Sequence, residues 1–264
     1  MYLSILEYSK ELAAIFLLGI AAYQDLKTRE IDDKIWIVIL AVNGAFTAFE
    51  LWFYHSLIYL MLYLISVAVG LAIAAVMHFG KMMGGADVKA LIALSLTETP
   101  KFRYIYGYVS IVPSLAILTN TVIISLFAPL FIFLNNVRKI DYLYGDLCPD
   151  ESILKKLIAL FALTKVSSKE YEKNKHKYAI AERRDGGCKR IMLSLFLEEK
   201  DSDVQPSGEV WVSYLLPYIL FIFLGYLCYV LRGALIDLSF KLVRIFLNTG
   251  TVMSMAANVR KLGN

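Results

Sequence analysis

Two aspartates at the ends of predicted membrane segments are the residues best suited to chemistry. Asp25 closes an apolar stretch that begins near Leu3, and Asp87 opens a short one that ends near Thr99. Ionisable side chains at membrane depth are costly and therefore point to function. Two carboxylates within reach of each other cannot both ionise cheaply, so they share one proton. One can then take a proton from water while the other donates one, which activates the water for attack on an amide carbonyl.

Each aspartate also has a purely structural interpretation. An aspartate at a span end is often a solvated boundary residue, and Asp87 could cap the following helix through the backbone N–H of Lys89 or Ala90. Gly84 and Gly85 could form only a tight turn. The catalytic interpretation is favoured by the combination of features. Both aspartates are expected at the same membrane depth, a glycine pair precedes one of them, and the helix after that pair is too short to cross.

The composition is that of an integral membrane protein. The chain is 58% hydrophobic and only 19% charged, whereas soluble domains are about 45–50% apolar and about 25% charged. Residues 104–137 contain no Asp, Glu, Lys or Arg. A bilayer core of about 30 Å needs roughly 20 apolar residues of helix, and several segments meet that length. The net charge of +4 is too small for a nucleic-acid footprint, so no nucleic-acid partner is expected.

The apolar segments predict an all-α polytopic membrane protein with about six transmembrane helices and a small α+β soluble insert. A membrane core with both aspartates is expected over residues 1–134, the insert over residues 135–210, and a sixth span with an amphipathic tail over residues 211–264. The N-terminal segment has no basic stretch, which favours the first membrane helix over a cleaved signal peptide. The predicted helices are Leu3–Asp25, Ile35–Trp52, Leu57–Phe79, the short Asp87–Thr99, Ile105–Leu134 with a bend at Pro113 or Pro129, and Trp211–Leu231.

The soluble insert contains two local signals. Ser152–Leu163 has the pattern of an amphipathic helix, and residues 185–187 predict a hairpin between Tyr178–Arg183 and Cys188–Leu197. The three cysteines are far apart and form no CxxC pair, so neither a zinc ribbon nor a disulfide framework is expected. The scattered histidines argue against a metal site, and no cofactor is expected. The tail Ala234–Leu247 fits either an interfacial helix or a helix packed on the bundle.

Basic residues in short loops predict the orientation. The loop after the first span holds three basic residues and the loop before Asp87 holds Lys81, whereas the Trp52–Ser56 turn holds none. This places both aspartates and the insert on the cytoplasmic side. Lys101 and Arg103 would then lie outside, which counts against this orientation.

Two short motifs resemble those of a known protease family. Gly84-Gly85-Ala86-Asp87 resembles the GxGD motif of intramembrane aspartyl proteases, and residues 25–32, Asp-Leu-Lys-Thr-Arg-Glu-Ile-Asp, resemble the first aspartate motif of type IV prepilin peptidases. The similarity is greatest to the archaeal branch, the preflagellin (archaellin) peptidases. It covers residues 21–33 and 83–96 in detail and the rest as topology. Ala86 departs from the glycine of the motif, because it permits close approach but not an easy positive φ.

The resemblance implies an aspartic endopeptidase in the cell membrane. Such an enzyme removes short, charged class III signal peptides from preflagellins and pilin-like precursors at the cytoplasmic face, so its partners are those precursors and the lipid bilayer. The implied catalytic residues are Asp25 and Asp87, with motif support from Gly84, Gly85, Ala86 and Lys89. Gln24 separates Tyr23 from Asp25 and there is no Pro-Ala-Leu motif, which disfavours the presenilin branch. No CxxC pair is present, so the methyltransferase activity of bacterial relatives is not implied.

Two other functions fit paired intramembrane aspartates. A proton- or ion-coupled transporter could use them as a relay, although the chain has no internal repeat of the kind that many transporters show. A non-catalytic scaffold is the third possibility.

Two finer expectations concern charge. Asp87 at a helix start should hold the negative charge and Asp25 at a helix end the proton, although Lys27 and Lys89 could reverse this. Near them, Glu30, Asp32 and Asp33 could either attract a basic substrate segment or only solvate the loop.

Overall fold

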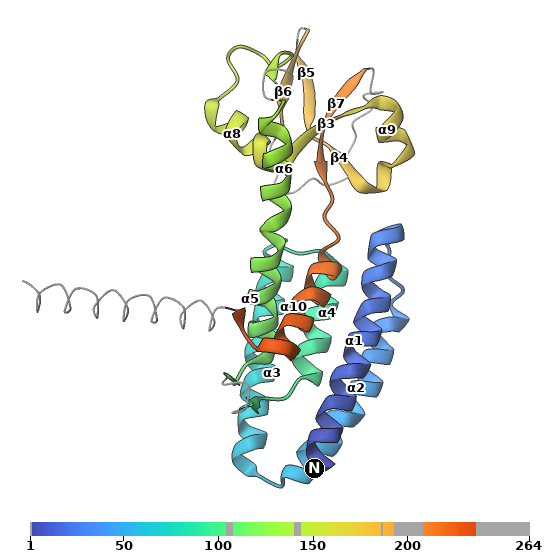
Figure 1. Cartoon of the computed structure of the whole chain (residues 1–264), viewed down its shortest axis with the longest axis vertical. Coiled ribbons are helices and arrows are strands. Elements are labelled where there is room, and N and C mark those ends of the chain that lie inside the picture. Colours follow the sequence, from blue (N-terminus) through green and yellow to red (C-terminus); the bar gives the residue numbers. More distant parts are fainter. Residues whose placement is uncertain (1, 104–107, 140–143, 186, 193–207, 236–264) are drawn as a thin grey trace, which may run out of the picture. The chain divides into compact units, whose positions relative to one another are not determined.

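The computed structural model describes residues 2–103, 108–139, 144–185, 187–192 and 208–235. The described residues divide into two compact units, whose elements are labelled in Figure 1. The helical unit comprises residues 2–18, 33–103, 108–123 and 222–235, and the sheet unit comprises residues 19–32, 124–139, 144–185, 187–192 and 208–221. Two helices, α1 (Tyr2–Thr28) and α10 (Tyr218–Arg232), contribute residues to both.

The helical unit contains most of the membrane-length helices. After α1 come α2 (Lys34–Tyr54), α3 (Leu57–Phe79) and the short α4 (Gly85–Thr97), then the hairpin strands β1 (Lys101–Arg103) and β2 (Tyr108–Ser110), and α5 (Pro113–Ser125). In the described part of the chain, three helical segments are long and apolar enough to cross a membrane, namely α2, α3 and residues 113–137. The chain is therefore a mostly helical membrane protein.

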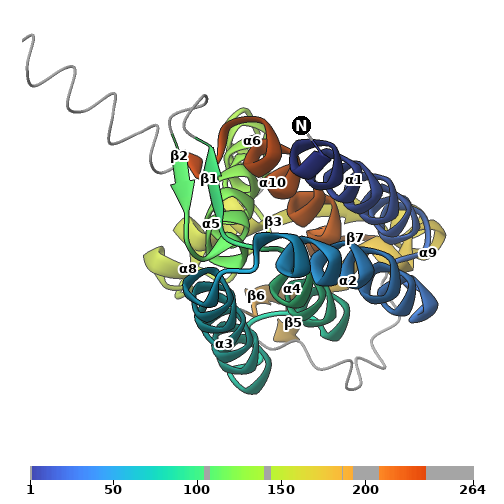
Figure 2. The same cartoon turned by 90° about the horizontal axis from the view of Figure 1, so that it is seen from below.

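Helix α4 is the central element of the helical unit. Figure 2 shows it beside α2 and α3, and it packs against both. Its 13 residues span only about 20 Å at 1.5 Å per residue. A helix that ends inside a membrane protein leaves backbone carbonyls without partners, and each must be satisfied internally.

Side-chain hydroxyls satisfy the carbonyls at the end of α4. Tyr63 donates to the carbonyl of Leu96 at 2.6 Å, and Thr47 donates to that of Thr97 at 2.5 Å. Three residues after α4 ends, the carbonyl of Pro100 accepts a hydrogen bond from the hydroxyl of Tyr59 at 3.2 Å. These bonds come from α2 and α3, so the two long helices hold the short one in place.

Five charged side chains are buried at the same end of α4. Lys10 from α1 forms a salt bridge to Glu50 from α2 at 2.5 Å, and Lys101 pairs with both Glu11 and Glu98. The side chains of all five residues are at most 2% exposed. Burying a charge is costly unless it is paired and hydrogen-bonded, so this cluster fixes α1, α2 and the end of α4 relative to one another.

The sheet unit begins with α6 and then alternates short helices and strands. Its order is α6 (Phe127–Val137), α8 (Ile153–Ala162), β3 (Leu163–Ser167), α9 (Ser168–Lys173), the 3-10 turn η2 (Lys175–Lys177), β4 (Tyr178–Ile180), β5 (Glu182–Asp185), β6 (Cys188–Ile191) and β7 (Glu209–Tyr214). One antiparallel sheet has the strand order β3-β7-β4, and β5 and β6 form a separate antiparallel hairpin. Trp211 on the central strand is fully buried against α8, β3 and β6 residues.

Several sequence-based boundaries are confirmed. α3 has the predicted limits, and α2 differs from its prediction by one residue at its start and two at its end. α8 matches the predicted amphipathic helix to within a residue at each end. The hairpin at residues 185–187 is present, with Asp185 opposite Cys188. However, Tyr178–Ile180 pairs with β7 and not with the hairpin.

The fifth predicted span is wrong at its start. It begins at Pro113 and not at Ile105, because residues 108–110 form strand β2. Proline suits the first helical position, where its missing N–H costs nothing. The helix is interrupted at Leu126, one turn before Pro129. Pro129 has no N–H to donate to the carbonyl of Ser125, which accounts for the break.

The sixth predicted span is also wrong. The Trp211–Leu231 segment is a strand followed by a helix, since β7 continues to Tyr214 and α10 starts only at Tyr218. Pro217 separates the two and disfavours helix for the residue before it. The predicted tail Ala234–Leu247 lies almost wholly outside the described residues.

The expectation of no disulfide is contradicted. Cys148 and Cys188 form a disulfide with their Cα atoms 5.0 Å apart, and Cys228 is a free thiol. The two residues are 40 positions apart, and β6 brings Cys188 to the loop before α8. This bond ties the hairpin to that loop within the sheet unit.

Candidate active site

Asp25 lies in the last turn of α1, where the helix ends in a defined way. Thr28 closes the turn by donating its hydroxyl to the carbonyls of Gln24 and Glu30, at 3.0 and 2.9 Å. Arg29 then adopts a positive φ of 60°, and its N–H still donates to the carbonyl of Asp25. A left-handed residue directly after the last turn is a common way to stop a helix.

The Asp25 carboxylate is buried beside Arg29 and the start of α10. The residue is 8% exposed. Its Oδ2 accepts a hydrogen bond from the backbone N–H of Ile219 at 3.1 Å, and its Oδ1 lies 3.9 Å from Nη1 of Arg29. Ile219 is in the first turn of α10, so the carboxylate of one helix caps the start of another. The positive end of a helix dipole and a guanidinium both favour a carboxylate at that point.

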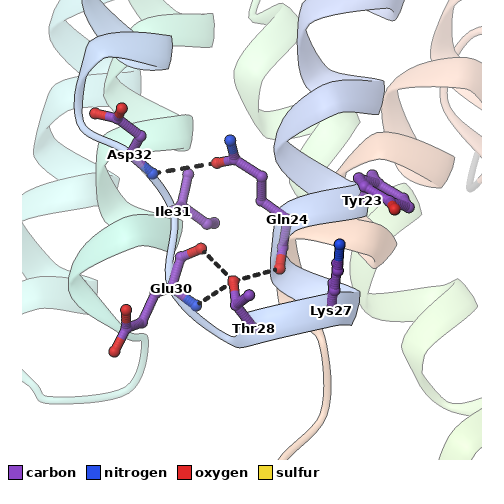
Figure 3. Close-up of a pocket in the computed structure, with 7 residues that line it drawn as sticks. All are labelled: Tyr23, Gln24, Lys27, Thr28, Glu30, Ile31 and Asp32. Carbon is purple, nitrogen blue, oxygen red and sulfur yellow. Dashed lines mark hydrogen bonds between the residues drawn. The ribbon is translucent and has the colours of Figure 1, made fainter.

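A hollow of about 480 Å³ lies beside the end of α1. Its lining residues are Tyr23, Gln24, Lys27, Thr28, Glu30, Ile31 and Asp32, and Asp25 is not among them. Figure 3 shows Gln24 and Thr28 facing the loop, with Tyr23 and Lys27 on the other side of the helix. The Gln24 side-chain oxygen accepts from the N–H of Asp32 at 3.2 Å. The loop that follows Asp25 is therefore shaped by its own hydrogen bonds.

Asp87 is the third residue of α4 and not its cap. The helix begins at Gly85 with Gly84 as its N-cap, and the Asp87 Oδ2 accepts from the N–H of Gly84 at 3.2 Å. The alternative that Asp87 caps the helix through Lys89 or Ala90 is therefore wrong in its partners, although Asp87 does help to cap the helix. Asp87 is partly exposed.

The two glycines before Asp87 differ in how much room a side chain would have at each position. A Cβ on Gly84 would lie 3.1 Å from Oδ2 of Asp87, whereas a Cβ on Gly85 would meet nothing within 4 Å. Gly84 thus leaves room for the carboxylate. Ala86 lies in the first turn of α4 and is not among the described residues with positive φ. The departure from glycine at this position is therefore compatible with the backbone.

Lys89 connects α4 to the loop before α2. Its Nζ forms a salt bridge to Oδ1 of Asp33 at 2.6 Å, with both side chains about half exposed or more. Exposed pairs of this kind contribute roughly 0–1 kcal/mol. Asp33 is therefore engaged within the protein, which weakens its assignment as an attractor of basic substrate residues.

The structure brings together some predicted site residues and adds others. The N–H of Gly84 donates to Asp87, and Lys89 forms a salt bridge to Asp33, while Asp25 and Asp87 belong to different units. The sequence analysis did not predict the contacts of Asp25 with Arg29 and with the start of α10. Arg29 was visible as a residue four positions away, but only Pro217 hinted that a helix starts near Ile219.

The expectation that Asp87 holds the negative charge and Asp25 the proton stays a prediction. Asp25 lies in the last turn of α1, and the structure adds the N–H of Ile219, at the start of α10, as a donor to the same carboxylate. Among the described residues, no cluster of three or more His, Cys, Asp or Glu could hold a metal ion.

Two comparisons with known proteins point to the same family. Residues 12–134, which include both aspartates, match the model of the type IV leader peptidase family. A preflagellin peptidase from Methanocaldococcus jannaschii is 27% identical over 245 residues, covering 87% of this chain and 93% of that relative. The similarity therefore extends beyond the membrane core into the sheet unit and α10.

Proposed function

Because residues 12–134 match the model of the type IV leader peptidase family, we propose that this chain is a membrane aspartyl endopeptidase that processes preflagellin-like and pilin-like precursors. It removes their short, charged class III signal peptides. Asp25 and Asp87 are the catalytic pair. The observation that carries this proposal is the match itself, since the matched residues contain both aspartates and the chain is similar to a preflagellin peptidase over most of its length.

The reaction needs one water molecule and one shared proton. One carboxylate takes a proton from the water as the oxygen attacks the scissile carbonyl, and the protonated partner donates to that carbonyl oxygen. The carboxyl that took the proton from water then gives it to the leaving amine as the C–N bond breaks, and the other carboxylate takes its proton back from a hydroxyl of the tetrahedral intermediate. The two carboxyl groups titrate as a coupled pair. A peptide bond inside a helix is shielded from such attack, so the substrate helix unwinds at its end near the pair.

Local contacts support a role for each carboxylate. Asp25 accepts from the N–H of Ile219, and Asp87 accepts from the N–H of Gly84. A backbone donor cannot swing away as a side chain can, so each carboxylate has a defined direction. Preorganised groups of this kind are what catalysis by positioning requires.

The membrane placement is part of the proposal. We place six helical segments in the bilayer, namely the three long apolar ones, α1, α10 and the short α4, which ends within the protein. Helix α1 has 27 residues, which is about 40 Å at 1.5 Å per residue. Its charged residues Lys10 and Glu11 are paired inside the helical unit. The catalytic pair lies near the cytoplasmic side, where the insert over residues 135–210 also lies.

A processing assay tests the function. The chain is co-expressed with a precursor carrying a class III signal peptide, and the precursor is followed on a gel. The proposal predicts a size shift that Asp25→Ala and Asp87→Ala each abolish. No observation supports the transporter alternative, which predicts no shift. A precursor that stays full-length with the unaltered chain, while a known peptidase of the family processes it, would contradict the proposal.

A further inference from the structure

Helix α8 in the sheet unit exposes an apolar face. Ile153 is 84% exposed, Leu154 64% and Leu157 51%, and Ile158 and Phe161 are also exposed. The opposite face, with Ala159 and Leu160, is buried in the core of the unit. An amphipathic helix of a soluble domain normally turns its apolar face inward. Helix α8 carries apolar side chains both on its buried side and on part of its outer side. Within the described part of the chain, nothing covers these outer apolar side chains.

The exposed face of α8 adjoins α6, which is part of a helical segment long enough to cross a membrane. Phe161 stacks on Phe133 of α6 with ring centroids 4.4 Å apart, and the Asn136 amide donates to the carbonyls of Leu160 and Leu163. Figure 1 shows α8 beside α6. α6 is the second half of the apolar segment 113–137, and it exposes its own large apolar residues Phe127, Leu130, Phe131, Leu134 and Val137. The apolar face of α8 therefore continues the lipid-facing surface of α6 at its end.

Basic residues flank this junction. Arg138 and Lys139 directly follow α6 and are exposed, and Lys156 lies on α8 between the apolar residues. Anionic lipid head groups attract basic residues at the membrane surface. The pattern of an apolar face with Lys and Arg at its edge is typical of a helix that lies in the membrane interface.

The size of the face favours lipid over a protein partner. Helix α8 has ten residues, which is about 15 Å of helix at 1.5 Å per residue. A stable protein interface buries about 800 Å² on each side, and one face of so short a helix supplies only a fraction of that. A bilayer surface has no such minimum, since it is already continuous with the lipid around α6.

We propose that α8 docks on the lipid bilayer as an interfacial helix. Ile153, Leu154 and Leu157 lie among the outermost acyl carbons, and Lys156 and Arg138 meet lipid phosphates. This contact would hold the sheet unit at the membrane surface. The inference does not depend on the peptidase activity, because it concerns how the unit is attached to the membrane.

Tryptophan quenching by brominated lipid tests the docking. The full chain carrying Trp52→Phe, which removes the one exposed native tryptophan, is placed in nanodiscs of phosphatidylcholine and phosphatidylglycerol with brominated acyl chains. Leu154→Trp reports on α8, and Glu172→Trp on the polar helix α9 is the matched control. We expect at least twofold stronger quenching of the tryptophan on α8. Adding Leu157→Glu should reduce that difference.

Two outcomes would overturn the proposal. The first is equal quenching at the two positions. The second is shielding of the α8 tryptophan that depends on protein concentration and not on brominated lipid, which would mean that a second copy of the chain covers the face. Near-UV circular dichroism of each variant confirms folding. Because this readout is independent of cleavage, its failure is distinguishable from failure of the proposed activity.

Discussion

The carboxylate of Asp25 accepts a hydrogen bond from the backbone N–H of Ile219, 194 residues further along the chain. The end of α1 is thereby fastened to the start of α10. Asp25, which we propose as a catalytic residue, therefore also joins two helices. These two roles can be separated by substitution, because the hydrogen bond needs only an oxygen acceptor, whereas the proposed catalysis needs an acid.

Two substitutions of Asp25 should separate stability from activity. Asp25→Asn keeps an oxygen that can accept from Ile219, whereas Asp25→Ala removes it. Loss of such a cap costs about 0.5–2 kcal/mol. We expect both variants to be inactive but only Asp25→Ala to unfold at a clearly lower temperature in detergent. Equal unfolding temperatures would mean that the bond to Ile219 contributes nothing.

Gly84→Ala should lower activity more than Gly85→Ala. The new Cβ at position 84 would lie 3.1 Å from Oδ2 of Asp87 and would push the carboxylate aside, whereas the one at position 85 has open space. The carboxylate has to move by only a few tenths of an ångström, so we expect a smaller loss than the roughly hundredfold that a 1 Å displacement of a catalytic group can cost. Processing rates of a precursor by the two variants provide the measurement. Equal losses would show that clearance at Gly84 does not position Asp87.

The sequence predicted correctly those helices whose bounds depend only on neighbouring residues. α3 is bounded by His55-Ser56 on one side and Gly80 on the other, and the uncharged run between them admits one interpretation. The Trp211–Leu231 segment misled because hydropathy does not distinguish a buried strand from a membrane helix. The sheet partners of β7 are β3 and β4, both of which lie more than 30 residues earlier, and no window around Trp211 contains that information.

The short motifs named Asp25 and Asp87 as the catalytic pair, which stays a prediction. The sequence did not predict the contacts around them, including the room that Gly84 leaves for the carboxylate of Asp87. The contact of Asp25 with Ile219 and the disulfide of Cys148 with Cys188 join distant segments with no characteristic spacing. Such pairings depend on tertiary packing, which a single sequence does not reveal.

Lys10→Met should destabilise the helical unit strongly. The change leaves the carboxylate of Glu50 buried without its cation, and breaking a buried pair costs about 3–5 kcal/mol. Lys169→Met on the exposed helix α9 removes the same charge without that cost. Thermal unfolding in detergent compares the two variants. A small effect of Lys10→Met, similar to that of the control, would contradict the buried salt bridge.

The sheet unit should lose stability in acid through Asp146. Burial alone would raise the pKa of this carboxyl, but hydrogen bonds and charges from Lys165 and Lys189 outweigh it and hold the pKa below its usual value. The unfolded chain then binds a proton more readily than the folded one. The stabilisation is complete above the ordinary Asp pKa of about 3.9 and is lost as the pH falls through the lower folded value.

Asp146→Asn provides the check on this pH dependence. Unfolding is followed by the fluorescence of Trp211. The centroid of its ring lies 5.3 Å from Nζ of Lys165. Between about pH 5 and about pH 2, the unaltered chain should lose more stability than the variant. Identical pH dependence in both would remove Asp146 from the explanation.

The most direct test of the catalytic pair is the processing rate of a purified precursor by Asp25→Asn and Asp87→Asn, each in the full chain reconstituted in lipid. Both changes preserve shape and a hydrogen-bond acceptor while removing the acid. Asp150→Asn, on the exposed surface of the insert, is the matched control. The account predicts that each of the first two lowers the rate by at least about a thousandfold and that the control does not. Processing that persists when either Asp25 or Asp87 is neutralised would contradict it.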